Sequence, residues 1–537
     1  MRIIKYIITI IFLFMNVLSA QNDSLNNIQI MKINSGLNNI LRSYQLLIEE
    51  HLSNIDPELL ADEAIKGMTN SLDDYTEYLN ESESNPYMKL LRKNFIGIGI
   101  NTEKQEDKIY INYLLDKSPA QLSGMKVGDR ILKIDDSIVD VNEDLNSKLQ
   151  GEIGTKVKIT IIRGFKKLDT LDFIIDRAKI SDKGITFYSL INDSIGYIQL
   201  KNFTTNTRND IISTYNEFKI QSNYNLKGII LDLRNNGGGL MKSAYDVFEL
   251  FVPVGKYFGK MINKYNQKIE IFTKKQPIDT NISIALIVNN NTASAGEFLT
   301  VALQDYNRAK VIGYYTTGKG ISQILRDISS HKSLKITTER FISPKGRDIN
   351  IINYNPKFSS EKSIAIDSQQ SNSMNARKGI IPDIIVQDSS YSPLILELLK
   401  RNVFNDFAND YIYFNIDKIP TESDNNLFRN FRYFAIDSFR NLNIISNSEL
   451  EEFKKTYNNQ VISSKIDELI DNINNYFINS FDNEKKDIIK ILNYEILLRH
   501  KSNVEVEEFI LKDDSFLIAT LKTFGIYNKS FYFSKKS

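Results

Sequence analysis

Ser294 and Lys319 are the two residues whose types and surroundings best suit nucleophilic catalysis. An apolar run, residues 284–288, leads into a polar turn that presents Ser294, and a segment with helical periodicity follows over 296–306. This strand, turn and helix arrangement exposes a serine in the way that a nucleophile requires. A second apolar strand, 310–313, leads to a Gly-Lys-Gly turn that carries Lys319. Ser294 follows one strand and Lys319 follows the next, with a single helix between them. This strand–helix–strand arrangement can therefore bring the two side chains together.

Both residues also have simpler interpretations. Glu297 lies three residues after Ser294, which is the spacing of a capping box, so Ser294 can also be a helix N-cap. A lysine in a glycine turn is, from sequence alone, a solvated surface residue. Local pattern leaves both interpretations of each residue open.

The composition removes several other kinds of catalytic site. The chain of 537 residues has no cysteine and three histidines, which excludes thiol catalysis and disulfides and leaves almost no basis for a Cys/His zinc site. His51 and His500 lie in helical patterns near the chain ends. His331 falls in the catalytic region, where Ser-Ser-His-Lys is more typical of a surface turn than of a general base. If Ser294 is a nucleophile, its base must be something other than histidine.

A run of three glycines, Gly237–Gly239, follows the apolar strand that ends in Asp232-Leu-Arg. Without Cβ atoms, these residues let backbone N–H groups point at a ligand. The run lacks the Lys-Ser/Thr ending of a phosphate-binding P-loop. An oxyanion hole fits better, because it needs the same exposed donors and gains from an adjacent helix N-terminus.

The N-terminal segment, residues 1–20, has the pattern of an export signal. Arg2 and Lys5 precede an apolar stretch that ends near Leu18, and Ser19-Ala20 offers small residues for cleavage. An uncleaved membrane anchor is the alternative, but the apolar core is short for a span of ~20 residues. We therefore expect an exported protein that works in the periplasm or at the outer face of the cytoplasmic membrane.

The length of the chain predicts roughly three or four domains. After the signal, a helical region over 21–94 precedes a segment of short strands over 95–178, and strands then alternate with helices over 179–391. The last region, 392–537, again has helical periodicity, and we interpret its frequent aromatic residues as core. A polar stretch inside the third region, 355–376, reads as a mobile surface loop. In the second region the expected strands are 96–100, 109–114, 130–134, 156–162 and 170–175.

The second region resembles a PDZ domain. The resemblance lies in Phe95-Ile-Gly-Ile-Gly99, Ser118-Pro-Ala, Gly128-Asp-Arg-Ile-Leu-Lys-Ile-Asp and Gly154-Thr-Lys-Val. In a PDZ domain, a glycine loop binds a peptide's terminal carboxylate through backbone N–H groups while the peptide pairs as an added strand. The resemblance implies that this loop consists of Phe95, Ile96, Gly97, Ile98 and Gly99. The alternative is that the glycines only permit a bend in a strand.

Taken together, the ordered motifs of residues 95–385 resemble the C-terminal processing peptidases, also called tail-specific proteases. The motifs are the PDZ segment, Asp232-Leu-Arg-Asn-Asn-Gly-Gly-Gly, Thr292-Ala-Ser-Ala-Gly-Glu297, Ala302-Leu-Gln-Asp-Tyr, Gly318-Lys-Gly with Gln323, and Gly379-Ile-Ile-Pro-Asp383. The resemblance implies a multidomain α+β chain. Its α/β peptidase core would be a ββα spiral of the crotonase/ClpP-like kind, with an inserted PDZ β-domain and helical N- and C-terminal regions.

The same resemblance implies that Ser294 is the nucleophile, Lys319 the general base and Gln323 the residue that orients the lysine. A lysine, with an ordinary pKa of about 10.4, accepts a proton only if burial disfavours its charged form. A neutral amide can hold the amine without restoring that charge, whereas a carboxylate would raise its pKa. We therefore prefer Gln323 to Asp305 or Glu297 for this role, and interpret Asp305 as structural.

The resemblance further implies an oxyanion hole made by the backbone N–H groups of Gly239 and Ala295, with Gly238 as the alternative to Gly239. Loss of one such donor costs ~2.7–4 kcal/mol in the transition state. Gly296 departs from the family pattern, which more often has a small polar residue there, and this departure would loosen the turn.

These features predict a serine endopeptidase that captures protein C-terminal tails through its PDZ domain and cleaves them without a metal or cofactor. The 67 basic and 66 acidic residues nearly cancel, so we expect no nucleic-acid partner. Homodimerisation through the terminal helices and membrane association are further expectations. The alternative from another class is a non-catalytic PDZ scaffold that keeps a peptidase-like fold.

Overall fold

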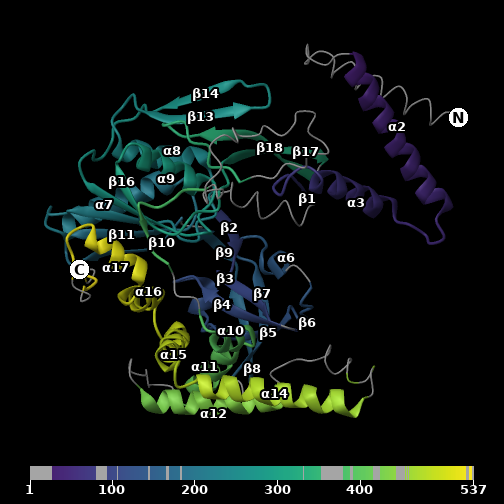
Figure 1. The fold of residues 1–537 in the computed structure, drawn as a ribbon, viewed down its shortest axis with the longest axis vertical. Coiled ribbons are helices and arrows are strands. Elements are labelled where there is room, and N and C mark those ends of the chain that lie inside the picture. Colours follow the sequence, from purple (N-terminus) through teal and green to yellow (C-terminus); the bar gives the residue numbers. More distant parts are fainter. Residues whose placement is uncertain are drawn as a thin grey trace. The chain divides into compact units, whose positions relative to one another are not determined.

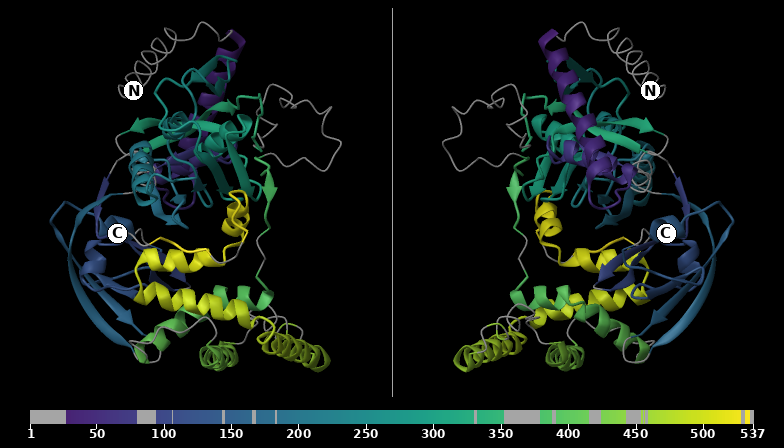
Figure 2. Two further views of the ribbon diagram at one scale, coloured as in Figure 1. Left: turned by 90° about the vertical axis from the view of Figure 1, so that its left-hand side faces the viewer. Right: turned by 90° about the vertical axis from the view of Figure 1, so that its right-hand side faces the viewer.

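The structure is a computed structural model, shown from three directions in Figure 1 and Figure 2. It describes residues 27–79, 94–105, 107–142, 145–164, 168–181, 184–329, 332–351, 379–387, 391–414, 424–442, 454, 456, 459–527 and 531–534. The predicted export signal, the predicted surface loop 355–376, His331 and most of a predicted helix over 449–457 lie outside these residues. The described residues divide into two compact units: those within 27–78 and 325–336 form one, and those within 79–324, 337–351 and 379–534 form the other.

The first unit contains two helices that the sequence predicts. α3 (Pro57–Asn70) begins at the N-cap Asp56, whose Oδ1 accepts hydrogen bonds from the N–H groups of Glu58 and Leu59 at 2.8 and 3.2 Å. Lys332 ties strand β18 to this helix, because its Nζ lies 2.7 Å from Glu58 and 2.8 Å from Asp62.

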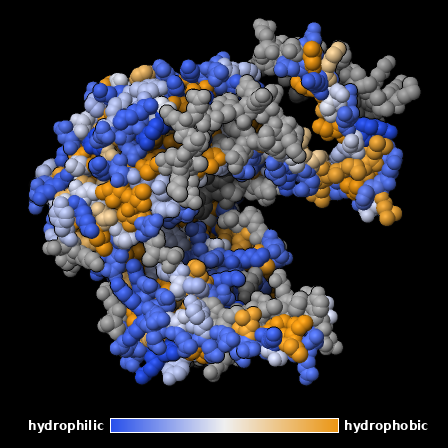
Figure 3. All heavy atoms as spheres, viewed as in Figure 1, coloured by the Kyte–Doolittle hydropathy of each residue, from blue (hydrophilic) through white to orange (hydrophobic). Residues whose placement is uncertain are grey.

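The other helix of this unit, α2 (Asn27–Glu50), contains no buried residue. Its apolar side chains lie on the surface, where they appear as orange patches along the helix in Figure 3. Among the described residues, no helix is both long and apolar enough to cross a membrane.

The strands predicted between residues 95 and 178 form a six-stranded sheet in the order β3–β4–β5–β7–β8, with β6 paired to β5. One prediction is wrong: residues 96–100 do not form a single strand. β2 (Asn94–Gly97) pairs with β9 (Ala178–Ser181), and β3 starts at Ile100, because Gly99 turns the chain with a φ of +82°. The other elements of this region are β3 (Ile100–Gln105), β4 (Lys108–Leu114), α5 (Pro119–Leu122), β5 (Arg130–Ile134), β6 (Ser137–Ile138), α6 (Leu145–Leu149), β7 (Lys156–Arg163) and β8 (Asp169–Asp176).

A second six-stranded sheet, ordered β10–β11–β12–β15–β16–β19, lies at the centre of the second unit. All neighbouring strands from β11 to β19 are parallel. Their carboxyl ends therefore share one edge, where the loops after β12, β15 and β16 carry the glycine run, Ser294 and Lys319. The strands are β10 (Ile185–Ile191), β11 (Ile195–Leu200), β12 (Gly228–Asp232), β15 (Ser283–Val288), β16 (Ala309–Gly313) and β19 (Ile384–Ile385).

Three helices pack against one face of this sheet, as the alternating pattern predicts. They are α7 (Thr207–Gln221), α8 (Met241–Phe251) and α9 (Ala295–Asp305), and their apolar side chains share one core with those of the strands. A further antiparallel sheet pairs β13 (Tyr257–Asn263) with both β14 (Lys268–Phe272) and β18 (Lys332–Ile342). β17 (Ile321–Ser329) also pairs with β18.

The C-terminal region forms helices with an aromatic core, as predicted. Phe404, Phe407, Phe431 and Phe481 are buried in it, and the rings of Phe404 and Phe431 stack with centroids 4.8 Å apart. Its helices are α10 (Pro393–Lys400), α11 (Val403–Phe414), α12 (Asn425–Leu442), α14 (Gln460–Ser480) and α15 (Lys485–His500).

The last helices, α16 (Asn503–Lys512) and α17 (Ser515–Lys522), belong to a different core. Phe516, Leu517 and Phe531 pack with Tyr197, Ile230 and Ile287 of the central sheet, on side chains that alternate with those facing α7, α8 and α9. The end of the chain also joins this sheet, since Phe533 bridges to Ile191 of β10. The C-terminal segment thus covers the second face of the central sheet.

Candidate active site

Ser294 is the residue between strand β15 and helix α9, and its backbone is strained. Its φ of +54° and ψ of −121° are unusual for a residue with a side chain. Such strain costs ~1–3 kcal/mol and occurs most often at functional sites. Ser294 also occupies the N-cap position of α9, so the capping interpretation describes its place in the helix correctly. It is partly exposed, whereas Ala293 and Ala295 on either side are buried.

The glycine loop lies directly against Ser294. Gly238 and Gly239 have φ values of +109° and +122°. A Cβ atom on Gly238 would lie 2.7 Å from Ser294 Cβ, and one on Gly239 would lie 2.4 Å from the carbonyl oxygen of Phe203. Only glycine allows this approach at both positions.

The backbone donors of this loop differ in a way that bears on the oxyanion hole. The N–H of Gly238 donates to Asn236 Oδ1 at 2.8 Å. Within the part of the chain that the structure describes, neither the N–H of Gly239 nor that of Ala295 donates to a protein acceptor. The two groups predicted as oxyanion donors are therefore available, and Gly238 is the less suitable of the two glycines.

Glu297 joins the serine turn to the lysine turn. Its Oε2 accepts from the backbone N–H of Ser294 at 3.0 Å and from that of Lys319 at 2.8 Å. Its Oε1 accepts from the N–H of Gly318 at 2.7 Å and from Thr316 Oγ1 at 2.5 Å. One carboxylate thus holds the backbones of both candidate catalytic residues, so the serine turn and the lysine turn lie next to each other.

This carboxyl group is fully buried, and burial raises its pKa. The four donors oppose that shift, because each favours the charged form. Three of them are backbone N–H groups, which cannot reverse their direction. The sequence pattern identified Glu297 only as a capping-box residue and missed its bonds to the lysine turn.

Gln323 lies near the start of β17, four residues beyond Lys319, and both residues are partly buried. Asp305 ends α9 and holds the turn around Ser343. It accepts from Ser343 Oγ at 2.6 Å and from the N–H of Lys345 at 2.9 Å, and it pairs with Arg347. This confirms the structural interpretation of Asp305.

The serine loop is also tied to the glycine loop by a group of amides that the sequence analysis missed. Asn235 accepts at Oδ1 from Asn289 Nδ2 at 2.9 Å and from Asn291 Nδ2 at 3.0 Å, and its own N–H donates to Asn289 Oδ1. Asn236 accepts at its carbonyl from the N–H of Ala293 at 2.9 Å. The paired Asn-Asn and Asn-Asn-Asn runs were the available signal, but nothing local shows that they face each other.

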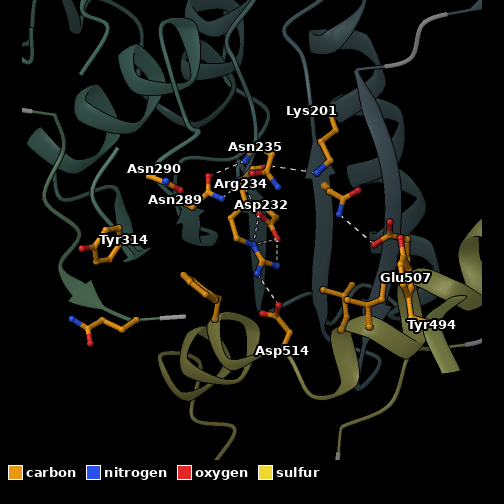
Figure 4. A pocket seen from close by; sticks show the side chains of 15 residues that line it. Lys201, Asp232, Arg234, Asn235, Asn289, Asn290, Tyr314, Tyr494, Glu507 and Asp514 are labelled. Atoms are coloured by element: carbon orange, nitrogen blue, oxygen red, sulfur yellow. Dashed lines mark hydrogen bonds and ion pairs between the residues drawn. The ribbon is translucent and has the colours of Figure 1, made fainter. Parts of the chain in front are cut away.

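A cavity of about 610 Å³ adjoins these loops at the carboxyl edge of the central sheet (Figure 4). Lys201, Arg234 and Asn289 line it from the ends of β11, β12 and β15, and Glu507 and Asp514 line it from the C-terminal segment. Burial raises the pKa of Glu507, whose Oε2 accepts from Gln199 Nε2 at 3.3 Å. The loops that carry the candidate site are therefore in contact with α16 and α17 through a polar surface.

The structure places only part of the predicted PDZ loop outside a strand. Phe95, Ile96 and Gly97 belong to β2, which pairs with β9, and Ile98 and Gly99 lie between β2 and β3. Gly97, Ile98 and Gly99 are buried, and the carbonyl of Ile98 accepts from the N–H of Ala120 at 3.0 Å. A Cβ on Gly99 would lie 2.4 Å from Ser118 Cβ, so this glycine does permit a bend, as the alternative interpretation predicts. β3 is the end strand of its sheet, which is the position required for an added peptide strand.

Comparison with known proteins first identifies the class. Residues 194–359 match Peptidase family S41, residues 97–171 match the PDZ domain, and residues 394–524 match a family described as probable PDZ-protease, C-terminal helical domain. The chain belongs to the S41 family of C-terminal processing peptidases.

Particular relatives are 30% identical to this chain over the part that they match. The carboxy-terminal processing protease CtpA of Bacillus subtilis (strain 168) is 30% identical over 325 residues, which is 60% of this chain and 68% of that protein. A probable CtpA-like serine protease of Staphylococcus aureus (strain COL) is 30% identical over 319 residues, which is 59% of this chain and 63% of that protein. The chain thus spans less than two thirds of the Staphylococcus relative.

Among solved structures, the photosystem II D1 C-terminal processing protease is similar to this chain. It has 23% sequence identity and a TM-score of 0.38, over 64% of this chain and 85% of that one.

Proposed function

We propose that this protein is a serine endopeptidase that processes the C-terminal tails of other proteins by a Ser-Lys-Gln mechanism. The observation that carries the proposal is the Glu297 carboxylate, which binds the backbone N–H groups of Ser294 and Lys319 through a single oxygen. The available N–H groups of Gly239 and Ala295 beside the serine support it. A scaffold protein would have no need for a strained serine between these two turns.

The proposed reaction uses these groups in order. The Oγ of Ser294 attacks the scissile carbonyl carbon as the amine of Lys319 takes the hydroxyl proton, and Gln323 holds that amine. The N–H groups of Gly239 and Ala295 stabilise the charge that develops on the carbonyl oxygen. The proton then passes to the departing amine, which leaves an acyl-enzyme that water hydrolyses by the same route. No step requires a metal or cofactor.

The proposed substrate is a protein with a flexible C-terminal tail. β3 would pair with the tail as an added strand, and the Phe95–Gly99 loop would bind the terminal carboxylate. We also propose that the peptidase core is a ββα spiral of the crotonase/ClpP-like kind. The succession of β12, α8, β13, β15, α9 and β16 supports this arrangement.

Tail capture predicts a preference for a free carboxylate. An unfolded substrate with an apolar C-terminal tail should be cleaved, and the same substrate with an amidated C-terminus should show kcat/KM about tenfold lower, as expected for loss of one charge-assisted interaction. The measurement is steady-state cleavage followed by mass spectrometry of the fragments. The control is the same substrate with a free C-terminus and an acetylated lysine side chain in its tail. Equal rates for both termini would argue against capture by the PDZ region, and absence of any cleavage would argue for the non-catalytic scaffold.

We further propose that the protein forms a homodimer through α2. Its apolar residues Ile30, Ile33, Leu37, Ile40, Tyr44 and Leu47 follow alternating three- and four-residue steps, the spacing of a coiled-coil seam. Such a seam fits a helix with the same spacing, and a second copy of this chain supplies one. The exposure of Ile33, Leu37 and Ile40, each about half accessible, leaves this seam uncovered in the single chain.

The dimer is tested by molar mass in solution. The chain from Gln21 onward should have twice the monomer mass by light scattering, and the double substitution Leu37→Lys and Ile40→Lys should halve it. Asn38→Lys, on the opposite face of the helix, is the matched control and should remain dimeric. A monomeric wild type, or a dimer that survives both seam substitutions, would show that α2 is not the interface.

Export to the periplasm or the outer face of the cytoplasmic membrane is also a proposal, and membrane association would follow if the first segment is kept. It is supported by the pattern of residues 1–20. N-terminal sequencing of the mature chain checks it, because cleavage after Ala20 leaves Gln21 as the first residue, and an intact Met1 would contradict cleavage.

A further inference from the structure

The side chain of Arg234 is held by two carboxylates from distant parts of the chain. Its Nη2 lies 2.6 Å from Asp232 Oδ2 on β12, and its Nη1 lies 2.7 Å from Asp514 Oδ2 at the start of α17. Figure 4 shows Arg234 between these two groups. The guanidinium carbon also lies 5.1 Å from the centre of the Phe516 ring. Helix α17 therefore contacts Arg234, which follows strand β12, through a hydrogen-bonded ion pair with Asp514 and through the aromatic face of Phe516.

This cluster is largely shielded from water. The side chains of Asp232, Arg234 and Asp514 are 1%, 16% and 13% exposed. Burial alone would lower the pKa of Arg234, but the two carboxylates more than reverse this effect and raise it. The interaction between Arg234 and Asp514 is thus weakly screened and is stronger than a surface ion pair.

Asp514 has a second bond that fixes its own position. It is the N-cap of α17, and its Oδ1 accepts from the N–H of Leu517 at 2.6 Å. One carboxylate oxygen therefore caps the helix while the other binds Arg234. Because α17 is anchored in the core through buried Phe516 and Leu517, it holds Asp514 on a rigid support.

From Arg234, a short path of bonds reaches the catalytic groups. The next residue, Asn235, binds Asn289 and Asn291 of the serine loop, and Asn236 binds Ala293 and Gly238. On the other side, the carbonyl of Leu233 accepts from Thr292 Oγ1 at 2.8 Å. The three residues around Arg234 thus hold the loop that ends at Ser294 and the loop that carries Gly239.

We propose that Asp514 is a positioning residue for the peptidase reaction. From the C-terminal segment, it fixes Arg234 and through it the relative placement of Ser294 and the oxyanion donor Gly239. The inference rests on the proposed function and adds a requirement to it: the region matched as a C-terminal helical domain supplies part of the active-site support. A displacement of about 1 Å at such a site can lower turnover by ~10²-fold.

The test uses full-length mature protein and three variants. Asp514→Asn removes the charge toward Arg234 but retains a good helix N-cap. Asp514→Glu keeps the carboxylate. Asp513→Asn makes the same charge change at the exposed neighbour and is the matched control. For each variant, the burst of p-nitrophenol from an activated ester counts competent sites, and steady-state peptide cleavage gives kcat per competent site and KM.

We expect Asp514→Asn to lower kcat per competent site about tenfold with KM within twofold of wild type, as for an interaction that aligns reacting groups. Asp514→Glu should retain most of the activity, and Asp513→Asn should equal wild type. Combining Arg234→Lys with Asp514→Asn should be no worse than Arg234→Lys alone, because both act through one contact.

Two other results would overturn the inference. If Asp514→Asn lowers only the melting temperature or the number of competent sites, while kcat per site is unchanged, Asp514 stabilises the fold without positioning the site. If the wild type shows no turnover at all, the proposed function fails and this inference fails with it. Turnover by the wild type separates the two failures.

Discussion

Ser294→Ala is expected to abolish peptide cleavage while tail binding remains. Without the hydroxyl, no acyl-enzyme forms, and the remaining donors of Gly239 and Ala295 supply only a small part of the catalysis, so kcat should fall by about 10⁴-fold or more. The measurement is peptide cleavage at a substrate concentration well above KM, with binding of a fluorescent tail peptide recorded in parallel. Ser283→Ala, an exposed serine at the start of the same strand β15, is the matched control and should cleave normally.

Lys319 should behave as part of the same catalytic unit. Lys319→Ala should lose about as much activity as Ser294→Ala, and the double variant should lose no more than either alone, because groups that act in one step are strongly non-additive. Lys319→Arg should also be inactive, since a guanidinium does not give up its proton in this pH range. Lys310→Ala, an exposed lysine on β16, controls for the loss of a positive charge. Residual activity above one hundredth of wild type in Lys319→Ala would rule out the lysine as the general base.

Much of the peptidase core follows from sequence periodicity. The runs 229–231, 284–288 and 311–312 are apolar without interruption, as expected for parallel strands covered on both faces, and each lies in a strand of the structure. The motif order then places the glycine loop, Ser294 and Lys319 after successive strands. Because parallel strands end at one edge, a correct element prediction was almost sufficient to bring these residues together.

The partners of those strands were harder to predict. Continuous apolar runs indicated that a second face is covered, but not by what, and the covering residues Phe516, Leu517 and Phe531 lie more than two hundred residues further along. Helical periodicity in the C-terminal region predicted helices with an apolar face. It did not show which surface that face packs against. The contact between Arg234 and Asp514 has no local signal for the same reason.

Gly99 shows a different limit of sequence reasoning. The stretch Phe95-Ile-Gly-Ile-Gly alternates like a strand. In the structure Gly99 instead has a φ of +82° and lies against Ser118, a tertiary contact that the local pattern does not show. Glu297 illustrates the same point within the site. Its spacing from Ser294 predicted one hydrogen bond correctly. Its three bonds to the lysine turn depend on the path that residues 316–319 take after β16, which the spacing does not show.

Glu297→Gln is therefore expected to disable the site although it changes one atom. The carboxylate accepts four hydrogen bonds, and a glutamine would place an NH₂ group against two of these donors, at least one of which is a backbone N–H that cannot turn away. Each buried donor left without an acceptor costs ~1–3 kcal/mol. Because the serine and lysine turns would separate, we expect kcat per competent site to fall by about 10²-fold or more.

Glu249→Gln is the matched control for this substitution. Glu249 is equally buried, lies on α8 and accepts from the backbone N–H groups of Lys274 and Lys275 at 2.5 and 3.0 Å, away from the serine and lysine turns. Its variant should lose less stability, because the three donors all bond Oε1 and a glutamine can keep its oxygen there. It should keep wild-type kcat per competent site. If both variants lower only the melting temperature, the role of Glu297 is stability alone.

The pH dependence gives a second check on Glu297, whose effect adds to the loss of turnover that protonation of the proposed base Lys319 causes. Burial raises its pKa above the ordinary value of 4.5, so the folded protein holds this proton more tightly than the unfolded chain does. The stability that it contributes is therefore present below pH 4.5 and is lost as the pH rises through the folded-state pKa. Activity should have the opposite trend, because the ionised carboxylate is the form that accepts from Ser294 and Lys319 together. Wild-type turnover should decline on acidification while the pH is still above 4.5, before the fold is lost, and circular dichroism at each pH separates the two effects. A decline that coincides with unfolding would assign the acid limb to the fold as a whole and not to this carboxylate.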